Sequence, residues 1–141
     1  MQGVHLLITV LALTVCASNV RSVELQLSEE MKELMAMLHE TCVDETGVNE
    51  DLISATMKGK FPEDGPLKCY MKCILVQGAG MDEDGIIDVE AIIAMLPDEL
   101  QADVPSGMRK CGTQTGVDDC DTAFKTNKCW YEHMPAKYFL I

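Results

Sequence analysis

The sequence predicts an all-α fold, a six-helix domain stapled by disulfides around an apolar cavity. First, apolar residues recur at spacings of three and four along most of the chain, between capping residues and helix-ending Gly or Pro. Second, once an export signal is removed, six cysteines remain, an even number that is typical of a disulfide framework. Third, the chain has ten Met but only seven aromatic residues, and flexible Met side chains suit an adaptable apolar wall.

Residues 1–22 have the pattern of a secretory signal peptide. An apolar run from Val4 to Val15 is followed by small residues, and we expect cleavage after Ser22, with Ala17 as a competing position. The run is too short to span a membrane. Either cleavage removes Cys16. We therefore expect a secreted, extracellular domain at residues 23–141.

The chain is strongly acidic. It carries 23 Asp and Glu against 11 Lys and Arg, a formal net charge of −12. Phosphates of nucleic acids and anionic lipid headgroups would be repelled by this charge. We expect no nucleic-acid partner and no membrane insertion, and the acidity itself favours solubility at high concentration.

The first two helices are predicted from their caps. Ser28 is placed to cap a helix whose first turn is acidic, and Gly47 ends it. Asn49 is placed to cap a short second helix, which ends at Gly59. The apolar stripes consist of Met31, Leu34, Met35, Leu38 and Cys42 on the first helix and Leu52, Ile53 and Met57 on the second.

The third and fourth helices follow a turn, FPEDGP, at residues 61–66. Pro66 suits the first position of the third helix, which the glycine-containing segment 78–85 ends. Asp88 is placed to cap the fourth helix, and Pro97 ends it. The expected inward residues are Leu67, Tyr70, Met71, Ile74 and Leu75 on the third helix and Val89, Ile92, Ile93 and Leu96 on the fourth.

The last third of the chain predicts two more helices and a tail. A fifth helix is expected from Glu99 to Cys111, with Pro105 and Gly107 as points of disturbance, and a sixth from Val117 to Tyr131. The C-terminal segment, residues 135–141, ends in the apolar sequence KYFLI. Chain ends are normally polar, so this segment is expected to lie against the protein.

The cysteines indicate disulfides rather than a metal site. Cys69 and Cys73 lie four apart on one helical face with nearly parallel Cβ directions, so each is expected to bond to a different segment. Excluding that bond leaves about a dozen pairings open. The cysteine spacing is not that of a zinc finger, and export favours oxidation. No metal ligand is therefore expected.

The sequence contains no arrangement that is typical of catalysis. His39 and His133 lie in no catalytic motif; they are expected to be structural or solvated, with a modest pH response as the alternative. The acidic stretch MDEDGIIDVE partly resembles a twelve-residue calcium-binding loop. When Gly85 is placed at the required sixth position, Gly80 occupies the first position and Ala91 the twelfth, so two ligands are lost. We expect neither an enzyme nor a cofactor.

The cysteine spacing and several short motifs resemble one family. From Cys42 the gaps are 26, 3, 37, 8 and 8 residues, with LKCYMKC at residues 67–73, KCW at 128–130 and the closing YFLI. This pattern resembles the insect odorant-binding (pheromone-binding) proteins of the six-cysteine type. The resemblance implies the disulfides Cys42–Cys73, Cys69–Cys120 and Cys111–Cys129, and non-covalent carriage of small apolar molecules.

The resemblance also implies a set of ligand-binding residues. Most lie on the last four predicted segments, and Asn127 is expected to offer the ligand one hydrogen bond. The implied residues are Tyr70, Val89, Ile92, Ile93, Leu96, Val104, Met108, Trp130, Tyr138, Phe139, Leu140 and Ile141.

Tyr70 has a further implied role. In the family subgroup that the tail resembles, this Tyr bonds the C-terminal carboxylate, which here belongs to Ile141. Acid would protonate that carboxylate and weaken a charge-assisted bond. The expected behaviour is ligand capture near neutral pH and release in acid.

The predicted function is that of a secreted carrier of small hydrophobic odorants or pheromones in aqueous lymph. An olfactory receptor and a second copy of the chain are further candidate partners. Three alternatives remain: a non-sensory carrier in haemolymph, gland or venom, a disulfide-rich signalling protein, and a membrane-active saposin-like bundle. The cysteine order and negative charge place the saposin-like bundle last.

Overall fold

Helices make up the framework of the computed structural model, which describes residues 27–141. The predicted signal peptide and Cys16 lie outside the described residues. Within the described range there is no strand, and only Met81 and Ile87 form an isolated bridge. None of the helices described is both long and apolar enough to cross a membrane. The helices are α1 (Glu29–Thr46), α2 (Glu50–Met57), α3 (Gly65–Gln77), α4 (Val89–Ala94), α5 (Asp98–Gln101), α6 (Val104–Cys111) and α7 (Asp119–His133).

The predicted caps begin the helices. The Ser28 hydroxyl accepts a hydrogen bond from the Met31 N–H, and Asn49 and Asp88 cap α2 and α4 in the same way. Gly47 ends α1 in the left-handed conformation, at φ 65°, which Gly adopts without steric cost. The all-α class predicted from the sequence is therefore confirmed.

The number of helices differs from the prediction. The single fifth helix expected from Glu99 to Cys111 is wrong, because α5 ends at Gln101 and α6 begins at Val104. Pro105 has no N–H to donate to the Gln101 carbonyl, and its ring would clash with that carbonyl in a continuous helix. The described chain consequently has seven helices instead of six.

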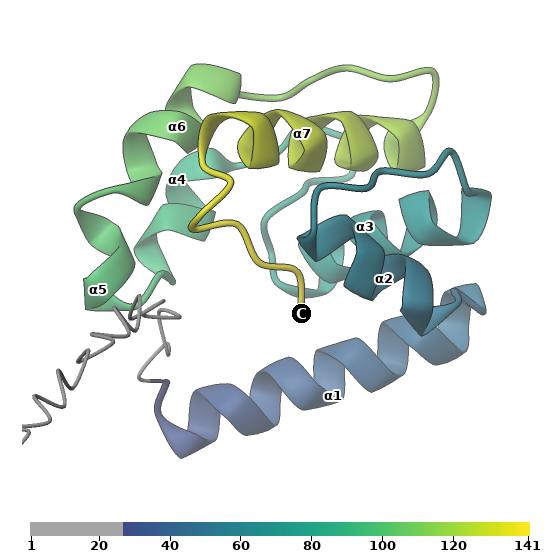
Figure 1. Ribbon diagram of the computed structural model, residues 1–141, viewed down its shortest axis with the longest axis horizontal. Coiled ribbons are helices and arrows are strands. Elements are labelled where there is room, and N and C mark those ends of the chain that lie inside the picture. Colours follow the sequence, from purple (N-terminus) through teal and green to yellow (C-terminus); the bar gives the residue numbers. More distant parts are fainter. Residues whose placement is uncertain (1–26) are drawn as a thin grey trace, which may run out of the picture.

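Helices α3 and α7 pack against each other at the centre of the fold. Helix α1 packs against α3, while α6 packs against α7 and contacts α4 and α5. Figure 1 shows that α1 crosses one side of the molecule and that the C-terminal segment leaves α7 and runs between α7 and α1. Helix α1 therefore lies beside the C-terminal segment as well as against α3.

Three disulfides join these helices. Cys42–Cys73 links α1 to α3, Cys69–Cys120 links α3 to α7, and Cys111–Cys129 links α6 to α7. These are the pairs that the family resemblance implies, and the two cysteines of α3 bond to different helices. Each bridge stabilises the fold by roughly 2–4 kcal/mol. The framework can therefore tolerate the cost of an internal cavity.

A polar cluster lies where α3 meets α7. Asp121 accepts hydrogen bonds from Lys68 at 2.8 Å and from the Val117 N–H at 3.1 Å, and it pairs with Lys125 at 2.9 Å. These donors hold the pKa of the Asp121 carboxyl well below its usual range. Lys68 also lies 4.8 Å from the centre of the Phe124 ring. The cluster fixes α7 on α3 through paired charges.

Candidate ligand-binding pocket

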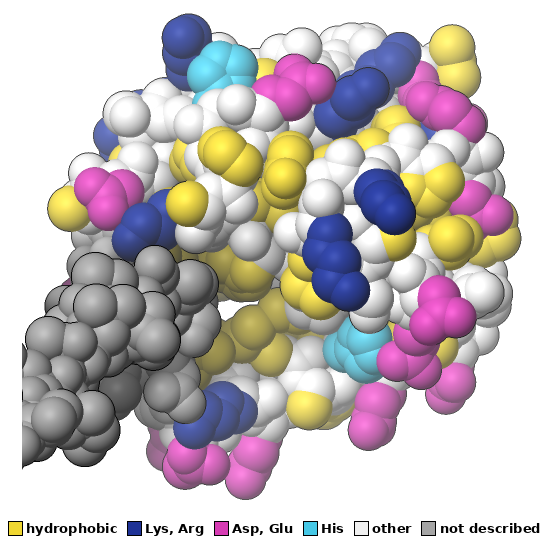
Figure 2. Space-filling model, in the orientation of Figure 1, with side chains coloured by type: hydrophobic (Ala, Val, Ile, Leu, Met, Phe, Trp, Pro, Cys, Tyr) yellow, Lys and Arg dark blue, Asp and Glu magenta, His cyan; other side chains and the backbone are white. Residues whose placement is uncertain are grey.

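The described part of the protein contains an apolar pocket of about 240 Å³. Figure 2 shows hydrophobic side chains inside a hollow between α1 and the rest of the molecule. Helices α1, α3, α4, α6 and α7 and the C-terminal segment all contribute to the wall. The lining residues are Leu27, Met31, Leu34, Met35, Leu38, Met71, Ile74, Leu75, Gly78, Ile92, Met95, Leu96, Pro97, Val104, Met108, Asn127, Trp130, Met134, Lys137, Tyr138, Phe139, Leu140 and Ile141.

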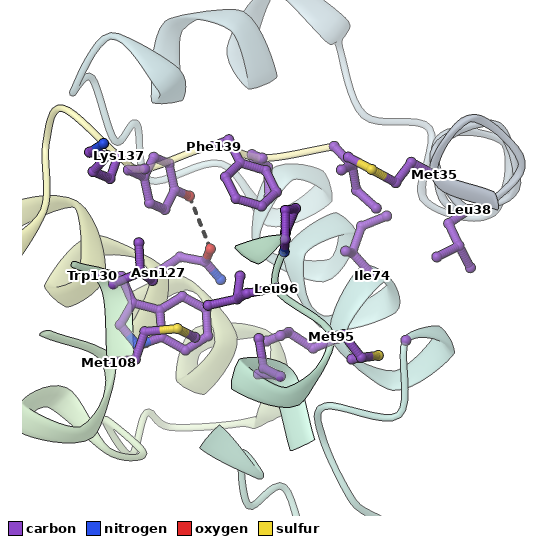
Figure 3. A pocket seen from close by; sticks show the side chains of 18 of the residues that line it. Met35, Leu38, Ile74, Met95, Leu96, Met108, Asn127, Trp130, Lys137 and Phe139 are labelled. Atoms are coloured by element: carbon purple, nitrogen blue, oxygen red, sulfur yellow. Dashed lines mark hydrogen bonds between the residues drawn. The ribbon is translucent and has the colours of Figure 1, made fainter. Parts of the chain in front are cut away.

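Nearly the whole wall is apolar. Six Met side chains line it, and their sulfur atoms and flexible stems can adjust to different apolar shapes. Side chains of Met35 and Leu38 approach from α1, opposite Trp130 and Met108 (Figure 3). The polar side chains of the lining are those of Asn127, Lys137 and Tyr138, together with the indole N–H of Trp130.

Nine of the twelve residues that the resemblance implied for ligand binding line this pocket. They are Ile92, Leu96, Val104, Met108, Trp130, Tyr138, Phe139, Leu140 and Ile141.

The other three, Tyr70, Val89 and Ile93, lie outside the lining. Ile92 on α4 and Leu96, two residues beyond its end, both line the pocket. Ile93 points about 100° away from Ile92 and is buried in the core, with only 6% of its surface exposed. Val89 packs against the same core. Tyr70 is fully buried and contacts the end of the C-terminal segment.

Several pocket residues were absent from the sequence-based site. The stripe of α1 was predicted as an apolar face, but its spacing does not say whether that face covers a core or a cavity. The same holds for the inward residues of α3. These missed residues are Leu27, Met31, Leu34, Met35, Leu38, Met71, Ile74, Leu75, Gly78, Met95, Pro97, Met134 and Lys137.

The C-terminal segment is anchored by Tyr138. Its ring packs near Phe61 and Tyr131, with centroid separations of 6.0 and 5.6 Å. Its hydroxyl donates a hydrogen bond to the Asn127 Oδ1 at 3.0 Å (Figure 3). Burial raises the pKa of Tyr138, so the hydroxyl keeps its proton and remains a donor. These contacts position Phe139 and Leu140 at the pocket.

The end of the segment reaches Tyr70. The Tyr70 hydroxyl donates a hydrogen bond to an Ile141 carboxyl oxygen. Burial also raises the pKa of Tyr70. The Nδ1 of His39 lies 2.8 Å from the same hydroxyl. Since the phenol has a single proton and gives it to Ile141, the His39 Nδ1–H must be the donor in this contact.

His39 thus belongs to a polar chain that the sequence did not indicate. Its second ring nitrogen, Nε2, lies 3.5 Å from an oxygen of Glu50. Glu50, His39, Tyr70 and Ile141 therefore follow one another from α2 through α1 and α3 to the C-terminal segment. No sequence motif links these four residues, because their separation in the chain hides their contact.

One group of potential metal ligands occurs in residues 27–141, formed by Cys111, Cys129 and His133. The two sulfurs are bonded to each other, so neither is a thiolate that could bind a metal. The Nδ1 of His133 lies 3.0 Å from the Cys129 carbonyl oxygen, to which it can donate a hydrogen bond. The group is a helix-end hydrogen bond beside a disulfide.

A helical, disulfide-bonded domain with an apolar pocket and its own C-terminal segment in the wall defines a class of small-molecule-binding proteins. The model of the PBP/GOBP family matches residues 24–133. The chain therefore belongs to this family, the insect odorant-binding and pheromone-binding proteins.

The relatives found by sequence and by structure are also odorant-binding proteins. General odorant-binding protein 69a of Drosophila melanogaster is 34% identical over 90 residues, covering 63% of this chain and 61% of that relative, less than two thirds of its length. Odorant-binding protein 4 of Chrysopa pallens has a TM-score of 0.72 and 28% identity, covering 82% of this chain and 99% of that one. Odorant-binding protein 7 of Anopheles gambiae, solved with four disulfide bridges and an azo compound, has a TM-score of 0.67 and 26% identity over 82% and 99%.

Proposed function

We propose that this protein binds small hydrophobic odorants or pheromones and carries them through aqueous extracellular fluid. The observation that carries the proposal is the apolar pocket of about 240 Å³, in whose wall the C-terminal segment takes part. Burying apolar ligand surface is favourable by roughly 25 cal/mol per Å². An engineered apolar cavity of about 150 Å³ binds benzene, so this pocket suits a ligand with one ring or a short chain.

The family supports a carrier. The matched family consists of odorant-binding proteins, and the Anopheles gambiae relative was solved in complex with an azo compound. All six cysteines of the described chain are in disulfides, which suits an oxidising extracellular compartment. The export signal expected at residues 1–22 would deliver the protein there.

The pocket's chemistry also favours binding over catalysis. The described lining contains an amide, a paired ammonium group and two N–H or O–H donors of aromatic rings, but it does not place a nucleophile beside a base. A ligand held there meets mostly thioether and aliphatic groups. The proposed activity is therefore reversible, non-covalent carriage.

Acid-triggered release is the second part of the proposal. The Ile141 carboxylate accepts the Tyr70 hydrogen bond more strongly when it is charged. A bond that favours the charged form is present above the carboxyl's titration range and is lost as pH falls through it. Losing it frees the end of the C-terminal segment and opens the pocket wall formed by Phe139 and Leu140.

Probe displacement tests the carrier function. The mature, oxidised protein is titrated with N-phenyl-1-naphthylamine, whose fluorescence rises in apolar surroundings, and native mass spectrometry looks for co-purified apolar ligands. Saturable binding at micromolar protein, lost after reduction and alkylation, is expected. Failure to bind this probe, together with failure to bind any other apolar compound, would contradict the proposal.

A further inference from the structure

We propose that Met95 is an oxidation site at the opening of the pocket, where a hydroperoxide converts its thioether to a sulfoxide and thereby weakens the binding of apolar ligands. The effect on binding rests on the proposed carrier function. The site of oxidation itself is measured without any ligand, so the two can be tested apart.

Met95 combines exposure with a place in the pocket wall. Six of the described Met side chains line the pocket. In that wall Met95 is 48% exposed, whereas Met71 and Met108 are 0% and 3% exposed. Met37 and Met57 are also exposed, at 57% and 42%, but neither lines the pocket. Within residues 27–141, Met95 is therefore the one Met that is both exposed and part of the wall.

The exposed lining residues mark where the pocket reaches the protein surface. Leu34 on α1 and Met95 at the end of α4 are the exposed members of the described lining. Figure 3 shows Met95 at the edge of the wall that α4 contributes. A small peroxide in solution can therefore reach this side chain without entering the core.

The backbone around Met95 is held by hydrogen bonds. The Met95 N–H donates to the Ile92 carbonyl at 3.1 Å. The Gln101 Nε2 donates to the Ile93 and Leu96 carbonyls at 2.8 and 2.9 Å. Because these bonds use backbone groups and Gln101, oxidation of the sulfur leaves them intact. Its effect is consequently confined to the side chain and to what that side chain contacts.

The reaction is a two-electron oxygen transfer. A sulfur lone pair attacks the terminal oxygen of the hydroperoxide, the S–O bond forms as the O–O bond breaks, and the terminal proton moves to the departing oxygen. The sulfur is oxidised, and the peroxide is reduced to an alcohol, or to water in the case of hydrogen peroxide. All six cysteines of the described chain are in disulfides, so no thiol there competes for the oxidant.

A sulfoxide at this position opposes the binding of an apolar ligand. Met oxidation turns a flexible apolar side chain into a polar one. If the sulfoxide faces the pocket, its oxygen loses water against apolar ligand surface; if it turns outward, the ligand loses the apolar contact with Met95. Either arrangement lowers affinity, by about fivefold or more for one polar group that loses its hydrogen bonds to water.

Peptide mapping tests the site of oxidation. The mature, disulfide-bonded protein is treated with limiting hydrogen peroxide, and mass spectrometry follows each Met-containing peptide. We expect Met95 and Met37 to be oxidised before Met71 and Met108, because the latter are buried. Saturating N-phenyl-1-naphthylamine should slow oxidation of Met95 but not of Met37, since only Met95 lines the pocket.

A matched pair of variants tests the effect on binding. Leu is similar to Met in volume but has no sulfur to oxidise, so Met95→Leu is compared with Met37→Leu. Each protein is measured against its own untreated sample with N-phenyl-1-naphthylamine. Peroxide should lower affinity about fivefold or more in the unsubstituted protein and in Met37→Leu. In Met95→Leu the loss should stay within about twofold, because the remaining wall sulfurs are less exposed.

The outcomes separate this inference from the carrier function. Oxidation of Met95 no faster than that of Met71 would overturn the oxidation site. Unchanged affinity after complete oxidation of Met95, or equal losses in Met95→Leu and Met37→Leu, would overturn its effect on binding. In those cases the carrier function would stand, because the untreated protein binds the probe. Failure of the untreated protein to bind would count against the carrier function, while peptide mapping would still decide whether Met95 is the oxidation site.

Discussion

The Tyr70 hydroxyl donates a hydrogen bond to Ile141, a residue 71 positions further along the chain. Tyr70 lies on α3 between Cys69 and Cys73, each of which is bonded to a different helix. The donor is therefore held rigidly, while its acceptor ends the segment that walls the pocket. This contact joins the disulfide framework to the C-terminal segment in the pocket wall.

Replacing Tyr70 by Phe should weaken ligand binding without unfolding the protein. The ring is retained, but Ile141 loses its donor. A hydrogen bond to a charged group is worth about 1.5–3 kcal/mol, so ligand dissociation at pH 7 should accelerate by about tenfold or more. Stopped-flow release of N-phenyl-1-naphthylamine measures this rate. Tyr131→Phe, which leaves the Ile141 contact intact, is the control, and equal rates in both variants would contradict the role of Tyr70.

Adding one Gly after Ile141 should remove the acid-triggered release. The added residue leaves a carbonyl acceptor at Ile141 but moves the negative charge away from Tyr70. Without the extension, affinity should hold between pH 7 and 5 and fall below about pH 4, where α-carboxyl groups are protonated.

Affinities measured across this pH range, with circular dichroism as a check on folding, test that expectation. A loss of affinity centred near pH 6 would assign the response to a histidine and not to the carboxyl group. Equal pH profiles with and without the added Gly would also count against the carboxylate.

A charge on the inner face of α1 should abolish ligand binding. Met35 lines the pocket, whereas Met37 is 57% exposed and lies on the opposite side of the helix. Met35→Lys would place an ammonium group against apolar ligand surface, so we expect at least a tenfold loss of affinity. Met37→Lys should leave affinity within twofold. If both variants bind the probe equally, α1 is not a wall of the ligand site.

Acid should destabilise the fold partly through Asp121. Its donors lower the pKa of the carboxyl in the folded protein, so its stabilising effect is present at neutral pH and disappears as pH falls. Asp121→Asn should lower the melting temperature at pH 7 and make it less sensitive to acid between pH 5 and 2. Asp119→Asn, at a half-exposed residue 3.4 Å from Lys72, is the control and should change both less. Parallel melting-temperature curves for Asp121→Asn and the unsubstituted protein would contradict the prediction.

The helices were largely predictable because their signals are local. Ser28, Asn49 and Asp88 stand where caps are needed, and the intervening residues repeat at helical spacing. The difference at the fifth helix is also local, because Pro105 breaks the expected helix between Gln101 and Val104. The spacing of Cys69 and Cys73 also predicts that they do not bond to each other. Only the family resemblance implied the full disulfide pairing.

The candidate site was less predictable. Resemblance placed Ile92, Leu96 and Trp130 at the pocket, but it also placed Ile93 there, which helix geometry turns into the core. Met35 and Leu38 were recognised as part of an apolar stripe without any indication that the stripe faces a cavity. Spacing reports which residues share a face, whereas the partner of that face depends on packing between distant segments.

The sequence by itself determined the all-α class, the caps of the first helices, the acidic composition and an even set of six cysteines outside the predicted export signal. These properties follow from neighbouring residues, from composition and from counting. Only the tertiary structure decided that α1 and the C-terminal segment face one pocket, that His39 contacts Tyr70, and that the Trp130 N–H is buried without a partner. Each of these depends on atoms that the chain brings together from far apart, which no local pattern encodes.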